Sequence, residues 1–189
     1  MRKVTIGEPA THDDVITLVE YDPKWPAVFE REAGRIRRAL GERALRIEHV
    51  GSTAVPGLVS KPIVDLLLVV ADSADEDAYV PALEAAGYVL RIREPKWHQH
   101  RVFKGPDSDI NLHVFRRGCS EVKRMLSFRD RLCEDEADRE LYARTKRRLA
   151  QRRWQYVQDY ADNKSVVVEE ILARDVIGAA PPATDRSGG

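Results

Sequence analysis

IEHVGSTAVPGLVSKPIVDLLLVV, residues 47–70, is the stretch that decides the fold. It predicts a strand that ends at Gly51-Ser52, then a loop, then a second strand over 63–70. The second strand is apolar at every position except Asp65, which is the pattern of a strand buried on both faces. A buried carboxylate is costly unless it is paired, hydrogen-bonded or bound to a cation. Asp65 is therefore the first residue that needs an explanation.

The composition of the chain narrows the class of protein. A length of 189 residues suits one domain rather than two, and 43% hydrophobic with 33% charged residues is typical of a soluble globular protein. The formal net charge of +0 argues against nucleic-acid binding through bulk electrostatics. No apolar run suits a membrane span or a signal peptide, and Cys119 and Cys133 lack metal-site spacing. We therefore expect a reduced, cytoplasmic protein.

The order of the predicted elements indicates an α+β domain with a helical C-terminal part. We expect a flexible arm over 1–14, one domain over 15–178 and a disordered tail over 179–189. The expected strands cover 15–21, 47–50, 63–70, 88–93, 100–104 and 109–115. The expected helices cover 25–40, with Asp22 as its N-cap, and 75–86, 120–132, 136–160 and 163–174. A Gly-Pro turn at 105–108 favours an antiparallel hairpin between the strands on either side of it.

Four residues in the central stretch favour phosphate chemistry. Gly51 and Ser52 form a small turn, where a phosphate can approach backbone N–H groups and the hydroxyl adds a donor. Lys61 can neutralise a second phosphate, and Asp65 can hold a divalent cation. Together these are the parts of a phosphoryl or nucleotidyl transfer site. The alternative is structural: the turn only reverses the chain, and Asp65 pairs with Lys61 or an arginine.

Histidines around the predicted hairpin form a second candidate group. His113 shares one face of its strand with Asn111, opposite the apolar positions. His98 and His100 lie across the turn, and three histidines on paired strands are a candidate zinc site. The alternative for His113 is a hydrogen-bonded structural role.

The predicted helix over 136–160 is strongly basic, and it places Tyr142 and Lys146 one turn apart on one face. One explanation of the charge is a solvated face that balances the acids at 134–140. The other is that Lys146 leans over the sheet toward a triphosphate.

Five segments together resemble the GrpB family of small bacterial proteins. They are VEYDPKWPAVFEREAGRI (19–36), IEHVGSTAVPGLVSKPIVDLLLVV (47–70), NLHVF (111–115), LSFRDRL (126–132) and LYARTKRRLA (141–150). The resemblance covers roughly 19–171, and the GSTAVPGL-x-x-KP-x-x-D run is its most specific part. The same unit appears as an appended domain on some bacterial dephospho-coenzyme A kinases. The resemblance implies a nucleotidyltransferase-like mixed β-sheet flanked by helices.

That superfamily has a Gly-Ser turn after one strand, an acidic pair on the next strand and a third acid on a later one. Gly51-Ser52 matches the turn and Asp65 matches the first acid. His113 lies on the strand of the third acid, and Lys146 resembles a helical lysine that contacts triphosphate.

The second acid position departs from the pattern because it holds Leu67. Two-metal catalysis uses two or three carboxylates. The resemblance therefore leaves either a single ion on Asp65, helped by His113, Asn111 or Glu48, or a fold kept for binding.

The first functional expectation is a transferase that moves a nucleotidyl or phosphoryl group from a nucleoside triphosphate to a small-molecule acceptor, including activation of a carboxylate for ligation. Gly51, Ser52, Lys61 and Lys146 would bind phosphates, and Asp65 and His113 would be catalytic and would hold Mg²⁺. Trp97 and residues 98–100 are candidates to line the acceptor side. The second expectation is a non-catalytic nucleotide- or coenzyme-binding module. No membrane or nucleic-acid partner is expected, and the sequence leaves the acceptor and the oligomeric state open.

Overall fold

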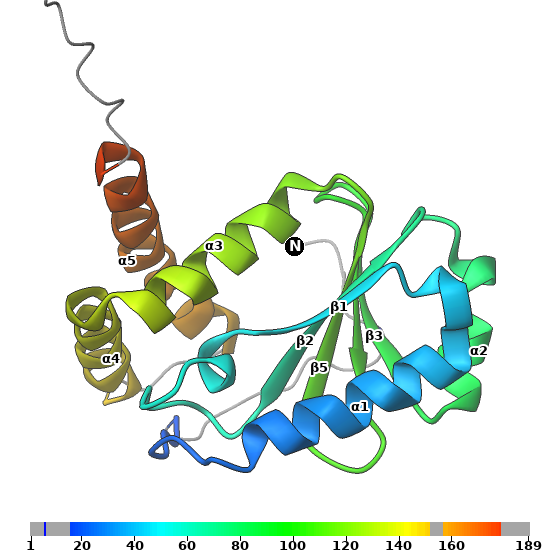
Figure 1. Ribbon diagram of the computed structural model, residues 1–189, viewed down its shortest axis with the longest axis horizontal. Coiled ribbons are helices and arrows are strands. Elements are labelled where there is room, and N and C mark those ends of the chain that lie inside the picture. The colour runs from blue at the N-terminus through cyan, green and yellow to red at the C-terminus, as the bar shows by residue number, and fades with distance from the viewer. Residues whose placement is uncertain (1–5, 7–15, 152–156, 179–189) are drawn as a thin grey trace, which may run out of the picture.

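The computed structural model describes Ile6, residues 16–151 and residues 157–178, which form a five-stranded mixed sheet flanked by helices (Figure 1). The elements in order are α1 (Trp25–Leu40), η1 (Gly41–Arg43), β1 (Arg46–Val50), η2 (Ser52–Ala54), β2 (Val64–Val70), η3 (Glu76–Ala78), α2 (Val80–Ala85), β3 (Val89–Glu94), β4 (His100–Lys104), β5 (Ile110–Arg116), α3 (Ser120–Glu134), α4 (Glu136–Ala150) and α5 (Val157–Gly178). The α+β class is confirmed. The expected arm, apart from Ile6, and the expected tail lie outside the described residues.

The sheet has the strand order β1-β2-β5-β4-β3, with β2 parallel to β5 and the other neighbours antiparallel. The predicted hairpin between β4 and β5 is confirmed, because Lys104 pairs with Asn111 across the Gly-Pro turn. β2 lies between β1 and β5, which explains its nearly unbroken apolar sequence. In the register of these strands, Asp65 has Val50 on one side and Asn111 on the other.

The two faces of the sheet are covered by different helices (Figure 1). On one face, Leu66 and Leu68 of β2 join the main core with Ile36 of α1 and residues of α2. Full burial of such a leucine contributes roughly 1.5–3 kcal/mol. Because side chains alternate along a strand, Asp65 and Leu67 point to the opposite face, which α3 covers in part.

The C-terminal helices pack on the loop that leads into β2. α3, α4 and α5 contact one another, and their apolar side chains surround the loop residues in a second core. This core contains Val55, Leu58, Val59, Leu132, Tyr142, Ala143, Val167 and Ile171. The helical C-terminal part is confirmed, and its packing brings α4 and α5 to the end of β2 that carries Asp65.

The expected strand over 15–21 is wrong. Among the described residues of this segment, Val19 forms an isolated antiparallel bridge and no strand is present. Leu18 packs against the helical core and Val19 against the main core, so the segment crosses between two cores and does not extend the sheet. The expected cap is also wrong: Lys24 is the N-cap of α1, and the Asp22 carboxylate accepts a hydrogen bond from the Lys24 N–H at 2.9 Å before the helix begins.

The bounds of some predicted helices differ in the structure. The helix expected over 75–86 is split into η3 and α2 at Tyr79, whose backbone has φ −142°. The Tyr79 ring is buried and its hydroxyl donates to the Ser73 carbonyl at 2.8 Å. The helix is interrupted where this side chain turns into the core. The helix expected over 136–160 ends earlier, as α4 at Ala150, and the helix expected over 163–174 begins earlier, as α5 at Val157. This segment carries no glycine or proline to mark the break.

Candidate functional site

Asp65 lies at the centre of the candidate site, on the face of β2 opposite α1. Asn111 Nδ2 donates to Asp65 Oδ1 at 2.8 Å, and His113 Nε2 lies 3.5 Å from the same oxygen. The Asp65 and His113 side chains are 26% and 22% exposed, so both can meet a ligand. Burial favours the protonated carboxyl, but the neighbouring His113 and Asn111 side chains and the charge of Lys164 outweigh it, and the pKa of Asp65 lies below its usual range. Asp65 is therefore an anion at neutral pH.

Gly51 brings the backbone of the predicted turn against this carboxylate. Its φ of +72° is in the left-handed region, and a Cβ at this position would lie 2.5 Å from Asp65 Oδ2. The next residue, Ser52, hydrogen-bonds through its side chain to Tyr142 of α4. Burial raises the pKa of Tyr142 to about 12, against the hydrogen bond from Ser52. The turn is thus fixed between the sheet and the C-terminal helices.

Lys146 projects from α4 into the same region and is 2% exposed. Its Nζ donates to the Val59 carbonyl at 2.6 Å and lies 5.4 Å from the centroid of the Tyr142 ring. Burial, together with the charge of Lys164, lowers the pKa of Lys146 to about 7, although Asp65 opposes the shift. An anion bound nearby would favour the protonated lysine.

The charge of Asp65 also acts on two more lysines, Lys61 and Lys164. Burial lowers the pKa of both lysines, and the charge of Lys164 lowers the pKa of Lys61 further. The charge of Asp65 opposes these shifts without cancelling them. Three lysines and the Asp65 carboxylate therefore act on one another at one end of β2, and the Asp109 carboxylate acts on Lys61 as well. A bound anion would favour the protonated form of these lysines.

The structure brings all six predicted site residues together around one end of β2. They are Gly51, Ser52, Lys61, Asp65, His113 and Lys146. The zinc hypothesis is wrong: the part of the chain that the structure describes, which includes all three histidines of the hairpin region, holds no group of three or more His, Cys, Asp or Glu placed to bind a metal.

Leu67, at the second acid position of the family resemblance, also has apolar surroundings in the structure. Leu67 is fully buried in a cluster between the sheet and α3. Glu48, which lies opposite Leu67, has one oxygen 2.9 Å from Arg46 Nε and the other 2.9 Å from Arg129 Nη1. The expectation that Glu48 helps Asp65 to hold an ion is therefore not supported, because two arginines already engage its carboxylate.

Lys164 and the hydrogen bond of Tyr142 were not predicted from the sequence. Lys164, Val167 and Ile171 occupy positions i, i+3 and i+7 of α5, so the lysine shares the apolar face of its helix. A charged residue on such a face was a visible signal. No sequence pattern indicated the hydrogen bond between Ser52 and Tyr142, because this contact depends on how α4 packs against the turn.

The fold and the site define a small α+β protein with a carboxylate and three lysines at one end of a mixed sheet. The family model for GrpB protein matches residues 15–174, and the chain belongs to this family. It is 63% identical over 174 residues to the UPF0157 protein BH1888 of Halalkalibacterium halodurans, over 92% of this chain and 89% of that one.

Two further relatives extend the comparison. The chain is 31% identical over 199 residues to a dephospho-CoA kinase of Mycolicibacterium paratuberculosis, over 92% of this chain but 48% of the kinase. The crystal structure of the conserved protein GrpB from Enterococcus faecalis matches with a TM-score of 0.67 at 30% identity, over 82% of this chain and 99% of that chain. Within the described residues, none of the helices has the length and apolarity that a membrane crossing requires.

Proposed function

We propose that this protein is a nucleotidyltransferase-like enzyme that moves a nucleotidyl or phosphoryl group from a nucleoside triphosphate to a small-molecule acceptor. The observation that carries the proposal is the convergence of a glycine turn, one ionised carboxylate and three lysines at one end of the sheet. Phosphoryl transfer depends mainly on positioning and on compensation of phosphate charge. These are the two properties that this group of residues offers.

The triphosphate would lie on the Gly51-Ser52 turn, whose backbone is free of a Cβ at the point closest to Asp65. Lys61 and Lys146 would contact its phosphates. Because burial lowers the pKa of Lys146 to about 7, the bound phosphate would draw a proton onto this lysine.

The donor set fits one Mg²⁺ that arrives with the nucleotide. Magnesium usually keeps several waters and is held by one or two carboxylates plus substrate phosphates. Asp65 would supply the carboxylate, with His113 beside it. When bound, the ion would neutralise phosphate charge. A second ion does not fit, because Leu67 is buried and Glu48 is bound by arginines.

His113 would act on the acceptor. Its Nε2 lies beside Asp65 and its side chain is partly exposed, so it can accept the proton of a hydroxyl or amine acceptor as the acceptor attacks the α-phosphorus and pyrophosphate leaves. A carboxylate acceptor has no proton to remove, and its attack would displace pyrophosphate and give an activated acyl nucleotide for ligation.

Calorimetric titration with ATP, GTP, CTP and UTP, each with and without magnesium, tests the proposal. We expect magnesium-dependent binding of at least one nucleotide by the wild type and its loss in Asp65→Asn. Asp72→Asn is the matched control, because Asp72 is an exposed acid beyond the other end of β2. Absence of binding to all four nucleotides would refute the proposed site.

A non-catalytic nucleotide- or coenzyme-binding module is the second candidate. Two observations favour it: the buried Leu67 in the second acid position, and a match that spans 48% of a protein named dephospho-CoA kinase. A module would bind its ligand with equal affinity in the presence and absence of magnesium. It would also leave a radiolabelled nucleotide intact in the presence of candidate acceptors.

A further inference from the structure

A chain of polar contacts connects the site to the turn between β3 and β4. Glu94 Oε2 lies 2.7 Å from His100 Nδ1, and His100 Nε2 lies 3.1 Å from His113 Nδ1. The third contact is the 3.5 Å separation between His113 Nε2 and Asp65 Oδ1. Glu94 and His100 are cross-strand partners, while His100 and His113 come from neighbouring strands. The order of the groups is carboxylate, imidazole, imidazole, carboxylate.

The two imidazole rings lie edge to edge. Their planes differ by 5° and their centroids are 5.3 Å apart, yet two of their nitrogens approach to 3.1 Å. Nitrogens that lie so much closer than the centroids require the rings to share a plane, which is the geometry of an N–H···N hydrogen bond. The His100 ring is fixed from other sides by the Phe115 ring, stacked at 4.5 Å, and by the edge contact with Trp97 at 5.1 Å.

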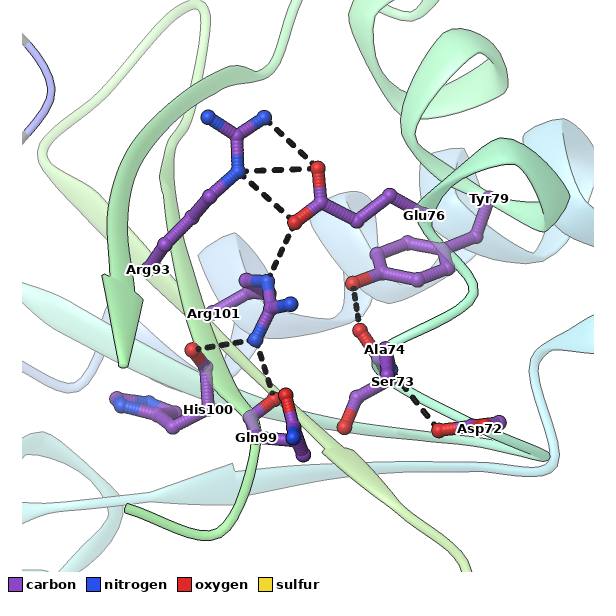
Figure 2. Close-up of polar contacts among 9 residues, drawn as sticks. All are labelled: Asp72, Ser73, Ala74, Glu76, Tyr79, Arg93, Gln99, His100 and Arg101. Carbon is purple, nitrogen blue, oxygen red and sulfur yellow. Dashed lines mark hydrogen bonds and ion pairs between the residues drawn. The ribbon is translucent and has the colours of Figure 1, made fainter. Parts of the chain in front are cut away.

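Hydrogen bonds also hold the backbone at Gln99 and His100 in place (Figure 2). The Arg101 guanidinium donates to the carbonyls of Gln99 at 2.9 Å and His100 at 3.2 Å, and to Glu76 at 2.6 Å. His98 and Gln99 have φ of 54° and 53°, which non-glycine residues adopt at a cost. Consecutive residues in this conformation persist where the surroundings over-determine them, and such positions cluster at functional sites.

The three contacts can be assigned by counting hydrogens. A neutral imidazole carries one N–H, so two neutral rings supply two hydrogens for three gaps. The 2.7 Å gap to an anionic carboxylate requires the hydrogen on His100 Nδ1, which leaves His100 Nε2 as an acceptor. The 3.1 Å gap is then bridged by the hydrogen on His113 Nδ1. The 3.5 Å gap, the longest of the three, receives none.

We propose that Glu94 and His100 are positioning residues that hold His113 as the Nδ1–H tautomer, with the lone pair of Nε2 directed toward Asp65. A carboxylate oxygen and an unprotonated imidazole nitrogen that face one another form a binding site for a proton or a cation. In the proposed function, on which this use rests, that charge is the acceptor proton or the ion that accompanies the nucleotide. A partner that orients a functional histidine through its other nitrogen is a common second layer of such sites.

A long-range ¹H–¹⁵N correlation spectrum of the uniformly labelled protein at pH 8 tests the proposal, because it distinguishes the two tautomers of each neutral histidine. We expect the Nδ1–H pattern for His113 in the wild type. In Glu94→Met, His100 loses its anionic partner and can move its hydrogen to Nε2. His113 should then change to the Nε2–H tautomer and donate to Asp65. Glu84→Met, at an exposed acid of α2, should leave the spectrum unchanged.

A wild-type His113 in the Nε2–H form would overturn the proposal, as would a Glu94→Met protein that folds and keeps the Nδ1–H form. His100→Phe keeps a ring against Phe115 and removes both hydrogen bonds, so it should cause the same change at His113. If neither variant folds, the wild-type spectrum alone decides. The test is independent of nucleotide: failure of every nucleotide to bind would end the proposed function and leave the tautomer result standing.

Discussion

Replacement of Lys146 by methionine should remove a pH dependence from the stability of the protein. Burial and the charge of Lys164 lower the pKa of Lys146 from 10.5 to about 7 in the folded state. In the unfolded chain the lysine returns to its ordinary value. Between these two values the unfolded state binds more protons than the folded state, so the free energy of unfolding rises with pH across this window.

The magnitude follows from the shift. Each pH unit within the window changes the free energy of unfolding by about 1.4 kcal/mol for a single group. Because the folded group is still half protonated at pH 7, the wild type should gain about 2 kcal/mol from this lysine between pH 7 and pH 9. Lys146→Met keeps an unbranched side chain one atom shorter and loses the charge, so it should lack this gain. The lost hydrogen bond to Val59 is a separate cost of about 1 kcal/mol that varies little with pH.

The assay is urea unfolding followed by far-ultraviolet circular dichroism at pH 7, 8 and 9. The difference in free energy of unfolding between wild type and Lys146→Met should move by about 2 kcal/mol in favour of the wild type as pH rises. Lys123→Met is the control, because Lys123 is exposed on α3, and it should follow the wild type. Parallel pH profiles for wild type and Lys146→Met would refute the argument that this lysine is buried at a cost.

Three further predictions concern β2 and its turn. Gly51→Ala should lower the free energy of unfolding by about 1–3 kcal/mol more than Gly57→Ala, because both glycines have positive φ but only Gly51 places the new Cβ against Asp65; equal losses in urea unfolding would contradict this. Asp65→Asn should keep the circular dichroism spectrum and abolish magnesium-dependent nucleotide binding, and unchanged affinity and metal dependence would remove Asp65 from the site. Leu67→Asp should destabilise by about 3 kcal/mol or more, because it buries an unpaired charge in an apolar cluster; thermal unfolding at the wild-type temperature would show that this position tolerates an acid.

The parts of the fold that the sequence predicted well are those set by local pattern. The apolar run over 63–70 identified β2, and the Gly-Pro turn identified the β4–β5 hairpin. The Gly51-Ser52 turn and Asp65 could be proposed as one site because the residue types suit phosphate and metal. Their direct contact depends on β1 and β2 being antiparallel neighbours, which pattern alone does not fix.

The parts that were missed depend on tertiary packing. The segment at 15–21 has strand-like residues, yet Leu18 packs in one core and Val19 in the other. The sequence between the end of α4 and the start of α5 has no glycine or proline, so the helical pattern did not indicate that α4 ends at Ala150. The Glu94–His100–His113 chain could not be predicted because it depends on the register of three strands, which brings residues from separate segments together.

The distance along the chain between Asp65 and two of its lysines, Lys146 and Lys164, has a consequence for synthesis on the ribosome. β2 emerges early, but its parallel partner β5 and the helices that carry these two lysines follow much later. Until they arrive, the most apolar strand of the protein lacks a neighbour on one side, and of the three lysines only Lys61 is present beside its carboxylate. Asp65 is then the one charge that interrupts an aggregation-prone run. Because a charge within an apolar run lowers its tendency to aggregate, the carboxylate at the centre of the site also favours the solubility of the unfinished chain.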